Sequence, residues 1–184
     1  MIYIGIDPGV NGGLAAIYPN GSVSFSRMPP SDGAVWEWLA PFRVEGVDSV
    51  ALIEKVQGHI GRKRTNKEGK EEVGHPGSAM FKFGQSYGAL RMALLASGIG
   101  PAIRRGWEVT PQEWQRGLEI SPREAGLGRG HWKKHLKRAA QRLFPRLKVT
   151  LKTADALLIA EWCRRVYLGD ALGEISRAVG GIVR

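Results

Sequence analysis

The chain of 184 residues has the length of one ordinary domain and can bury a sizeable hydrophobic core. Lysine and arginine outnumber aspartate and glutamate by ten, which gives a sequence pI of about 10.1 and favours a polyanionic partner. Because 43% of the residues are hydrophobic, the composition excludes a disordered basic arm, and we expect a single domain over residues 1–184.

We expect no segment for secretion or membrane insertion. The sequence opens on the apolar run Ile2–Ile6 without a charged leader, and no apolar run reaches roughly 18 residues. The single cysteine, Cys163, has no partner for an intramolecular disulfide and is expected to be a small buried side chain. We therefore expect a cytoplasmic protein that does not associate with a membrane.

The first 28 residues predict three strands joined by tight turns. Residues 1–7 are apolar and end in Asp7-Pro8-Gly9, which is turn chemistry. A second apolar run covers residues 12–18, and residues 22–28 alternate between apolar and polar side chains. We expect an antiparallel meander.

A helix is predicted over residues 34–42, followed by a strand over residues 49–56 that contains Glu54 near its end. The run Val50-Ala51-Leu52-Ile53 is apolar on both faces, as in a central parallel strand. Residues 58–77 then break the pattern, because they are rich in glycine and basic residues and almost free of large apolar ones. We expect a basic loop insertion there.

The second half of the chain is mainly helical. Helices are predicted over residues 78–97, 132–144 and 153–168, and a strand over residues 102–109. Thr110-Pro111-Gln112-Glu113 has the spacing of a capping box at a further helix start. The order βββαβαβαα predicts a mixed α/β fold, with an antiparallel first part of the sheet, then parallel strands, and helices on its flanks.

Three carboxylates carry the chemistry that the pattern predicts. Asp7 ends the first strand, Glu54 ends the fourth, and Asp155 begins the last helix. If the two strands are neighbours and the helix crosses their ends, the acids converge and repel one another unless cations neutralise them. Oxygen ligands of this kind suit Mg²⁺ or Mn²⁺, and two such ions can promote phosphodiester hydrolysis.

Taken one at a time, the three acids also have structural explanations. Asp7 before Pro8-Gly9 fits a turn residue, Glu54 fits a charge at a strand end, and Asp155 fits a helix cap. Their joint occurrence is what favours a metal site.

Together with neighbouring blocks, these residues resemble the RuvC-type Holliday junction resolvases, particularly their bacteriophage-encoded relatives. The resemblance spans roughly residues 2–168 in order and spacing. Its blocks are Ile4-Gly5-Ile6-Asp7-Pro8-Gly9, Gly12-Gly13-Leu14-Ala15, Ile53-Glu54, Phe83-Gly84-Gln85-Ser86-Tyr87-Gly88 and Ala154-Asp155-Ala156-Leu157-Leu158-Ile159-Ala160.

The resemblance implies an RNase H-like fold, a homodimer, and metal-dependent, symmetrical nicking of four-way DNA junctions. It makes Asp7, Glu54 and Asp155 metal ligands. Members of the family commonly carry a fourth ligand, acidic or histidine, one helical turn before the last aspartate, where this chain has Lys152. An ammonium cannot ligate Mg²⁺, so Lys152 either stabilises charge on the scissile phosphate or is a solvated lysine at a helix start.

Basic side chains that follow Glu54 and precede Asp155 are candidates for phosphate contacts. In the family the segment after the second acid reaches into the junction, and here its basic residues, with Gln85 on the next helix, are expected to bind DNA. Helix 132–144 carries a second basic group on one face. Both groups could instead be merely solvated. The expected DNA-binding residues are Arg62, Lys63, Arg64, Lys67, Gln85, Lys133, Lys134, Lys137 and Arg138.

Aromatic residues and small residues have their own interpretations. Phe81 and Phe83 could stack on unpaired bases, but their helical spacing favours packing in the core or in a dimer. Gly84 and Gly88 permit the close approach of a second helix. Trp114 lies in an apolar-patterned segment and is expected in the core.

Other classes of protein remain open at this point. Sugar kinases and actin-like ATPases begin with a similar strand and hairpin but need a second such domain, so we expect no nucleotide cofactor. A nuclease of the same superfamily that cuts flaps or structured RNA would share the metal site. A binding module whose acids only cap and turn would bind branched DNA without cutting it.

Overall fold

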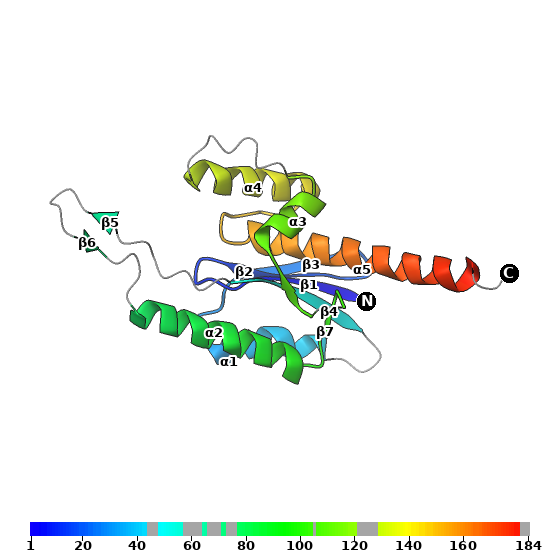
Figure 1. The fold of residues 1–184 in the computed structure, drawn as a ribbon, viewed down its shortest axis with the longest axis horizontal. Coiled ribbons are helices and arrows are strands. Elements are labelled where there is room, and N and C mark those ends of the chain that lie inside the picture. Colours follow the sequence, from blue (N-terminus) through cyan, green and yellow to red (C-terminus); the bar gives the residue numbers. More distant parts are fainter. Residues whose placement is uncertain are drawn as a thin grey trace.

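A mixed β-sheet lies at the centre of the structure, and helices cover both of its faces (Figure 1). The computed structural model describes residues 1–43, 48–56, 64–65, 71–72, 77–104, 106–120 and 129–180. The mixed α/β architecture that the sequence predicts is confirmed.

The first strands of the sheet are those predicted at the start of the chain. Strands β1 (Ile2–Asp7), β2 (Gly13–Ile17) and β3 (Val23–Arg27) form an antiparallel meander, and β4 (Ser49–Glu54) pairs with β1 in parallel. The strand order is β3-β2-β1-β4-β7. The first and fourth strands are therefore neighbours, as convergence of their terminal acids requires.

The continuous strand predicted over residues 102–109 is wrong. Two short strands replace it, β7 (Gly100–Pro101) and β8 (Glu108–Val109), and both pair in parallel with β4. Between them Ile103 and Gly106 form an isolated antiparallel bridge, and Gly106 has a φ of +115°. A backbone bent in this way cannot continue a ladder, because side chains other than glycine rarely adopt that φ.

Two helices cover one face of the sheet. They are α1 (Asp32–Leu39), extended by the 3₁₀ turn η1 (Ala40–Phe42), and α2 (Gly77–Ala96). Ser31 caps α1 by accepting a hydrogen bond from the backbone N–H of Ala34. After α2 the chain turns at Gly98, which has a φ of +66°.

In the described part of the chain, the helices on the opposite side of the sheet are α3 (Pro111–Gly117), α4 (Arg129–Leu143) and α5 (Ala154–Gly180) (Figure 1). Helix α5 continues for 12 residues past the predicted end at residue 168, and a helix of its 27 residues is about 40 Å long. None of the helices in the described part of the chain is long and apolar enough to cross a membrane.

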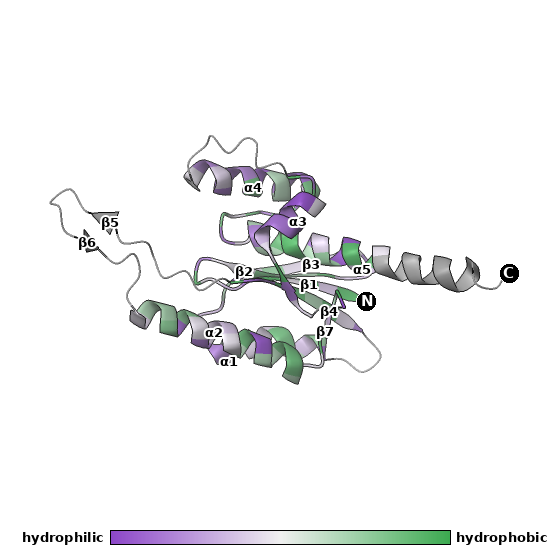
Figure 2. Cartoon of the chain, viewed as in Figure 1, coloured by the Kyte–Doolittle hydropathy of each residue, from purple (hydrophilic) through white to green (hydrophobic). Residues whose placement is uncertain are grey.

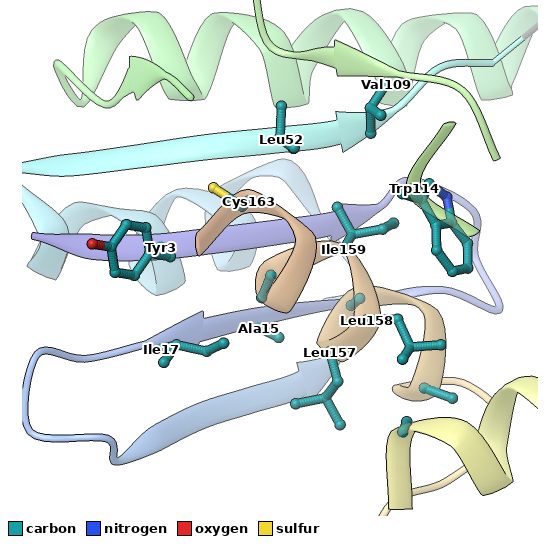
Figure 3. Packing of buried hydrophobic residues seen from close by; sticks show 14 of the residues in the cluster. Tyr3, Ala15, Ile17, Leu52, Val109, Trp114, Leu157, Leu158, Ile159 and Cys163 are labelled. Atoms are coloured by element: carbon teal, nitrogen blue, oxygen red, sulfur yellow. The ribbon is translucent and has the colours of Figure 1, made fainter. Parts of the chain in front are cut away.

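Strand periodicity sorts the apolar side chains into two cores. Ile4 and Ile6 pack under α1 and α2, whereas Tyr3, Val50 and Leu52 pack under α5. Figure 3 shows Leu52, Cys163, Ile159 and Trp114 between the sheet and the helices of the second core. Figure 2 shows hydrophobic stretches in parts of the strands and also in α2 and α5, while α3 and α4 include strongly hydrophilic positions. Odd-numbered side chains of β1 and even-numbered side chains of β4 face α5. Asp7 and Glu54 therefore lie on the α5 face of the sheet.

Helix α5 packs on β1 at a distance that only glycine allows. A Cβ atom at Gly5 would lie 2.1 Å from the backbone nitrogen of Ala160 and 2.3 Å from the carbonyl oxygen of Ala156. Both contacts are with backbone, which cannot move aside as a flexible side chain can. Gly5 therefore sets the spacing between β1 and the helix that carries Asp155.

Most of the predicted basic insertion at residues 58–77 lies outside the described residues, including Arg62, Lys63 and Lys67. The structure describes two short strands within it, β5 (Arg64–Thr65) and β6 (Glu71–Glu72), which pair antiparallel.

Candidate active site

Asp7 and Glu54 lie side by side at the carboxyl ends of two neighbouring parallel strands. The register pairs Ile6 with Ile53, so the next residues along β1 and β4 are the two acids. Because side chains alternate along a strand, both acids share the face that Gly5 and Leu52 present to α5. The arrangement places two carboxylates next to the first turn of that helix.

Asp155 completes the cluster from the first turn of α5 and is 5% exposed. The turn before it is held by Thr150 and Thr153, because the backbone N–H of Thr150 donates to the hydroxyl of Thr153 at 3.1 Å. A carboxylate in the first turn of a helix is stabilised by the backbone N–H groups that lack partners there. The three acids predicted from the sequence are thus brought together.

Burial and mutual repulsion raise the pKa values of the two strand-end carboxyls. Burial, and then the nearby charge of Asp155, raise the pKa of Asp7 to about 6. Burial, and then the charge of Asp7, raise the pKa of Glu54 to about 7, against the hydrogen bond from Trp114. The cluster therefore holds negative charge at a cost that a cation would remove.

Lys133 of α4 supplies one positive charge to this cluster. Its ammonium donates to Oδ2 of Asp155 in a close ion pair. Burial by itself would lower the pKa of Lys133, but the charge and hydrogen bond of Asp155, with the charges of Asp7 and Glu54, raise it. The sequence placed Lys133 on a DNA-binding face and did not indicate this contact.

The other oxygen of Asp155, Oδ1, is buried and has no hydrogen-bond partner among the described residues. A buried carboxylate oxygen without a donor costs free energy and suggests a missing ligand. Three carboxylates and one ammonium leave an excess of negative charge, so the donor set suits a hard divalent cation.

The described residues contain no group of three acidic, histidine or cysteine side chains already arranged around one point as metal ligands. In the structure the ammonium of Lys133 pairs with Asp155, one of these acids. Ligation of an ion by all three acids therefore requires the side chains to close in, and Oδ1 of Asp155 can take part while Oδ2 keeps its ion pair with Lys133.

Trp114 contacts the site through a hydrogen bond that sequence reasoning missed. Its indole Nε1–H donates to Oε2 of Glu54 at 3.0 Å. The sequence indicated a core tryptophan, and the side chain is indeed 0% exposed. No periodicity signal distinguishes a buried tryptophan that only packs from one that also donates to a carboxylate.

Comparison with solved structures finds that two RuvC structures have a similar fold. A Thermus thermophilus RuvC in complex with a Holliday junction substrate aligns with a TM-score of 0.56 at 14% identity, covering 91% of this chain and 94% of that one. A second T. thermophilus RuvC structure aligns with a TM-score of 0.52 at 19% identity, covering 93% and 97%. This chain has the RuvC fold.

No protein-family model and no curated protein matches the sequence, so the likeness rests on the fold. It confirms the RNase H-like architecture that the motif blocks imply. Asp7, Glu54 and Asp155 were singled out from motifs, and the RuvC fold brings them to one end of the sheet.

Lys152, the candidate fourth residue, lies in the turn before α5 and is partly buried. Its carbonyl oxygen would lie 3.0 Å from a Cβ atom at Gly13, so its backbone packs on β2. The structure brings Lys133 into an ion pair with Asp155, and the role of the Lys152 side chain stays a prediction.

Of the predicted DNA contacts within the described residues, Arg64 begins β5 and the others lie on α2 and α4. Lys134 and Arg138 are exposed, Lys137 is partly exposed, and the apolar face of α4 buries Leu136 and Ala140. Gln85 is exposed on α2. Phe81, on the same helix, is 67% exposed, so it does not pack in the core of the chain.

Proposed function

We propose that this protein is a divalent-metal-dependent endonuclease that resolves four-way DNA junctions by paired, symmetrical nicks. The observation that carries the proposal is the convergence of Asp7, Glu54 and Asp155 at one end of the sheet in a chain with the RuvC fold. The T. thermophilus RuvC is seen in complex with a Holliday junction substrate, and we extend that substrate to this chain.

The three carboxylates would hold Mg²⁺ or Mn²⁺, with two ions per site. Bound there, such ions lower the pKa of a water and stabilise the leaving oxygen of a phosphodiester. The chain contributes the rest by position: β1 and β4 fix Asp7 and Glu54, and α5 fixes Asp155. Lys133, which pairs with Asp155 beside the other two acids, would offer its ammonium to a scissile phosphate, with Lys152 as the second candidate for that role.

The exposed basic face of α4 would hold the phosphates on one side of the cleaved bond. Lys134, Lys137 and Arg138 lie on the helix that also carries Lys133, so the DNA backbone would run from that face toward the carboxylates. The segment at residues 58–77 and Gln85 would contribute further contacts.

Symmetrical nicking requires two sites related by a two-fold axis, and we propose a homodimer. The exposed side chains of Phe81, Met92 and Leu95 and the open surface at Gly84 and Gly88 make α2 a suitable interface helix. Sedimentation of the protein with and without a junction would measure the assembly.

The test is cleavage of an end-labelled four-way junction in Mg²⁺ or Mn²⁺, beside linear duplex, a flap, structured RNA and a sample with chelator. Paired nicks at symmetrical positions in the junction are expected, and Asp7→Asn should bind the junction without cutting it. Preferential cutting of the flap or of RNA would keep the metal site and overturn the substrate. Binding without cutting in either metal would identify a non-catalytic binding module.

A further inference from the structure

Helix α3 contacts the surroundings of both β4, which carries Glu54, and α5, which carries Asp155. It follows β8, in which Val109 is in register with Glu54 and accepts a 2.7 Å hydrogen bond from the backbone N–H of Lys55. At its other end, a Cβ atom at Gly117 would lie 2.2 Å from the indole ring of Trp162 on α5. The short helix is therefore held against both the strand of Glu54 and the helix of Asp155.

The start of α3 is fixed by a complete capping box. Glu113 accepts from the backbone N–H of Thr110 at 2.8 Å, and the backbone N–H of Glu113 donates to the Thr110 hydroxyl at 3.3 Å. Trp114, the next residue, is 0% exposed in the core with Val109 and Leu157. Its ring has little freedom to turn, so its N–H has a fixed direction.

That N–H points at Oε2 of Glu54. An indole nitrogen can only donate, so it can neither ligate a cation nor accept a proton from the site. A ligating carboxylate commonly depends on such a neighbour for its orientation. The hydrogen bond to Oε2 therefore restrains the orientation of the Glu54 carboxylate.

We propose that Trp114 is a positioning residue of the metal site, which orients Glu54 through its indole N–H. The inference deepens the proposed function and rests on it, because it presupposes that Glu54 ligates the ion. Loss of an outer partner of this kind typically weakens metal affinity about 10-fold to 100-fold.

The wild-type chain provides a spectroscopic test. Each of the six tryptophans gives one indole signal in a ¹H–¹⁵N spectrum, and the signal of Trp114 is identified by its displacement in Glu54→Gln. During Mg²⁺ titration that signal should move with the saturation of the site. The signal of Trp107, whose N–H donates to the backbone oxygen of Ile99 at 3.1 Å, serves as the internal control and should stay in place. A Trp114 signal that ignores Mg²⁺ while the metal binds would overturn the inference.

Substitution gives a second test with Mn²⁺ affinity, measured by electron paramagnetic resonance, as the readout. Trp114→Phe should weaken binding about 10-fold or more, whereas the matched variant Trp107→Phe should leave it unchanged. In a Glu54→Gln background, Trp114→Phe should have little further effect, because the indole acts through that carboxylate.

The outcomes separate the two proposals. Failure of the wild-type chain to bind Mn²⁺ would overturn the proposed metal site and the inference with it. The wild-type chain could instead bind Mn²⁺ normally while Trp114→Phe lowers the Mn²⁺ affinity equally in the wild-type and Glu54→Gln backgrounds. That result would support the metal site and overturn the positioning role of Trp114. If Trp114→Phe melts too early to be assayed, the titration of the wild-type indole signal decides alone.

Discussion

The charge of the carboxylate cluster should make the metal-free protein less stable as the pH rises. The folded-state pKa values of Asp7 and Glu54, about 6 and about 7, lie above their ordinary values of 3.8 and 4.5. The folded state therefore binds more protons than the unfolded state between about pH 4 and pH 7, and stability falls through that window. Above about pH 7 these two carboxyls cause no further loss of stability.

Asp7→Asn removes one of the repelling charges and tests this prediction. In chelator at pH 8 the variant should unfold with a free energy roughly 1–2 kcal/mol higher than wild type, and the gain should shrink toward pH 4. Thermal melts across this range measure it. A gain that is the same at every pH would show that the effect comes from packing and not from charge.

Lys133→Gln should have the opposite effect on the metal-free protein. Without the ammonium, the charge of Asp155 is uncompensated beside two other acids, and about 1–2 kcal/mol of stability should be lost at pH 8, since the lysine is partly exposed. Saturating Mg²⁺ should reverse most of the decrease in melting temperature that Lys133→Gln causes. Lys134→Gln, on the exposed face of the same helix, is the control and should change neither value.

At the scale of the elements, the contact between β1 and α5 decides how the acids meet. Gly5→Ala places a methyl group against the backbone of Ala156 and Ala160, which should cost about 1–3 kcal/mol and move Asp155 away from Asp7. Both the melting temperature and the Mn²⁺ affinity of Gly5→Ala should be lower than those of the wild type. Gly33→Ala in α1, where an added Cβ meets nothing within 4 Å, is the matched control.

The elements also show what could be predicted from the sequence. Asp7 and Glu54 were found because strand periodicity and turn residues locate the ends of strands, and the meander follows from its tight turns. The division of residues 102–109 into β7 and β8 was missed, because a single glycine at 106 does not reveal that its φ is positive.

The contacts of Lys133 and Trp114 could not be predicted, because they depend on how α3 and α4 dock. Helical periodicity identifies the buried face of α4 through Leu136 and Ala140. It does not say that a lysine at the edge of that face meets a carboxylate on another helix. Such pairings are set by tertiary packing between segments far apart in the sequence.

At the scale of the whole molecule, the net charge of +10 should make junction binding strongly dependent on salt. Replacing Lys134, Lys137 and Arg138 together by glutamine should reduce the slope of log affinity against log salt by roughly 3, at about 0.9 for each lost phosphate contact. The measurement uses Asp7→Asn as the background, so that the junction stays uncut.

Arg43→Gln provides the control for that experiment. Arg43 is exposed after η1, on the face of the sheet that α4 does not cover, and its loss should leave the slope nearly unchanged. Equal slopes for the triple variant and the wild type would show that the basic face of α4 does not contact phosphate.

Cys163 has a practical consequence for such measurements. It is the single cysteine of the chain, it is 0% exposed between α5 and the sheet, and burial raises the pKa of its thiol. A thiol in this state reacts poorly with maleimide dyes. One cysteine introduced on the surface, for example Arg43→Cys, should therefore accept a fluorophore selectively in the otherwise native chain, so that single molecules can be followed on a branched DNA.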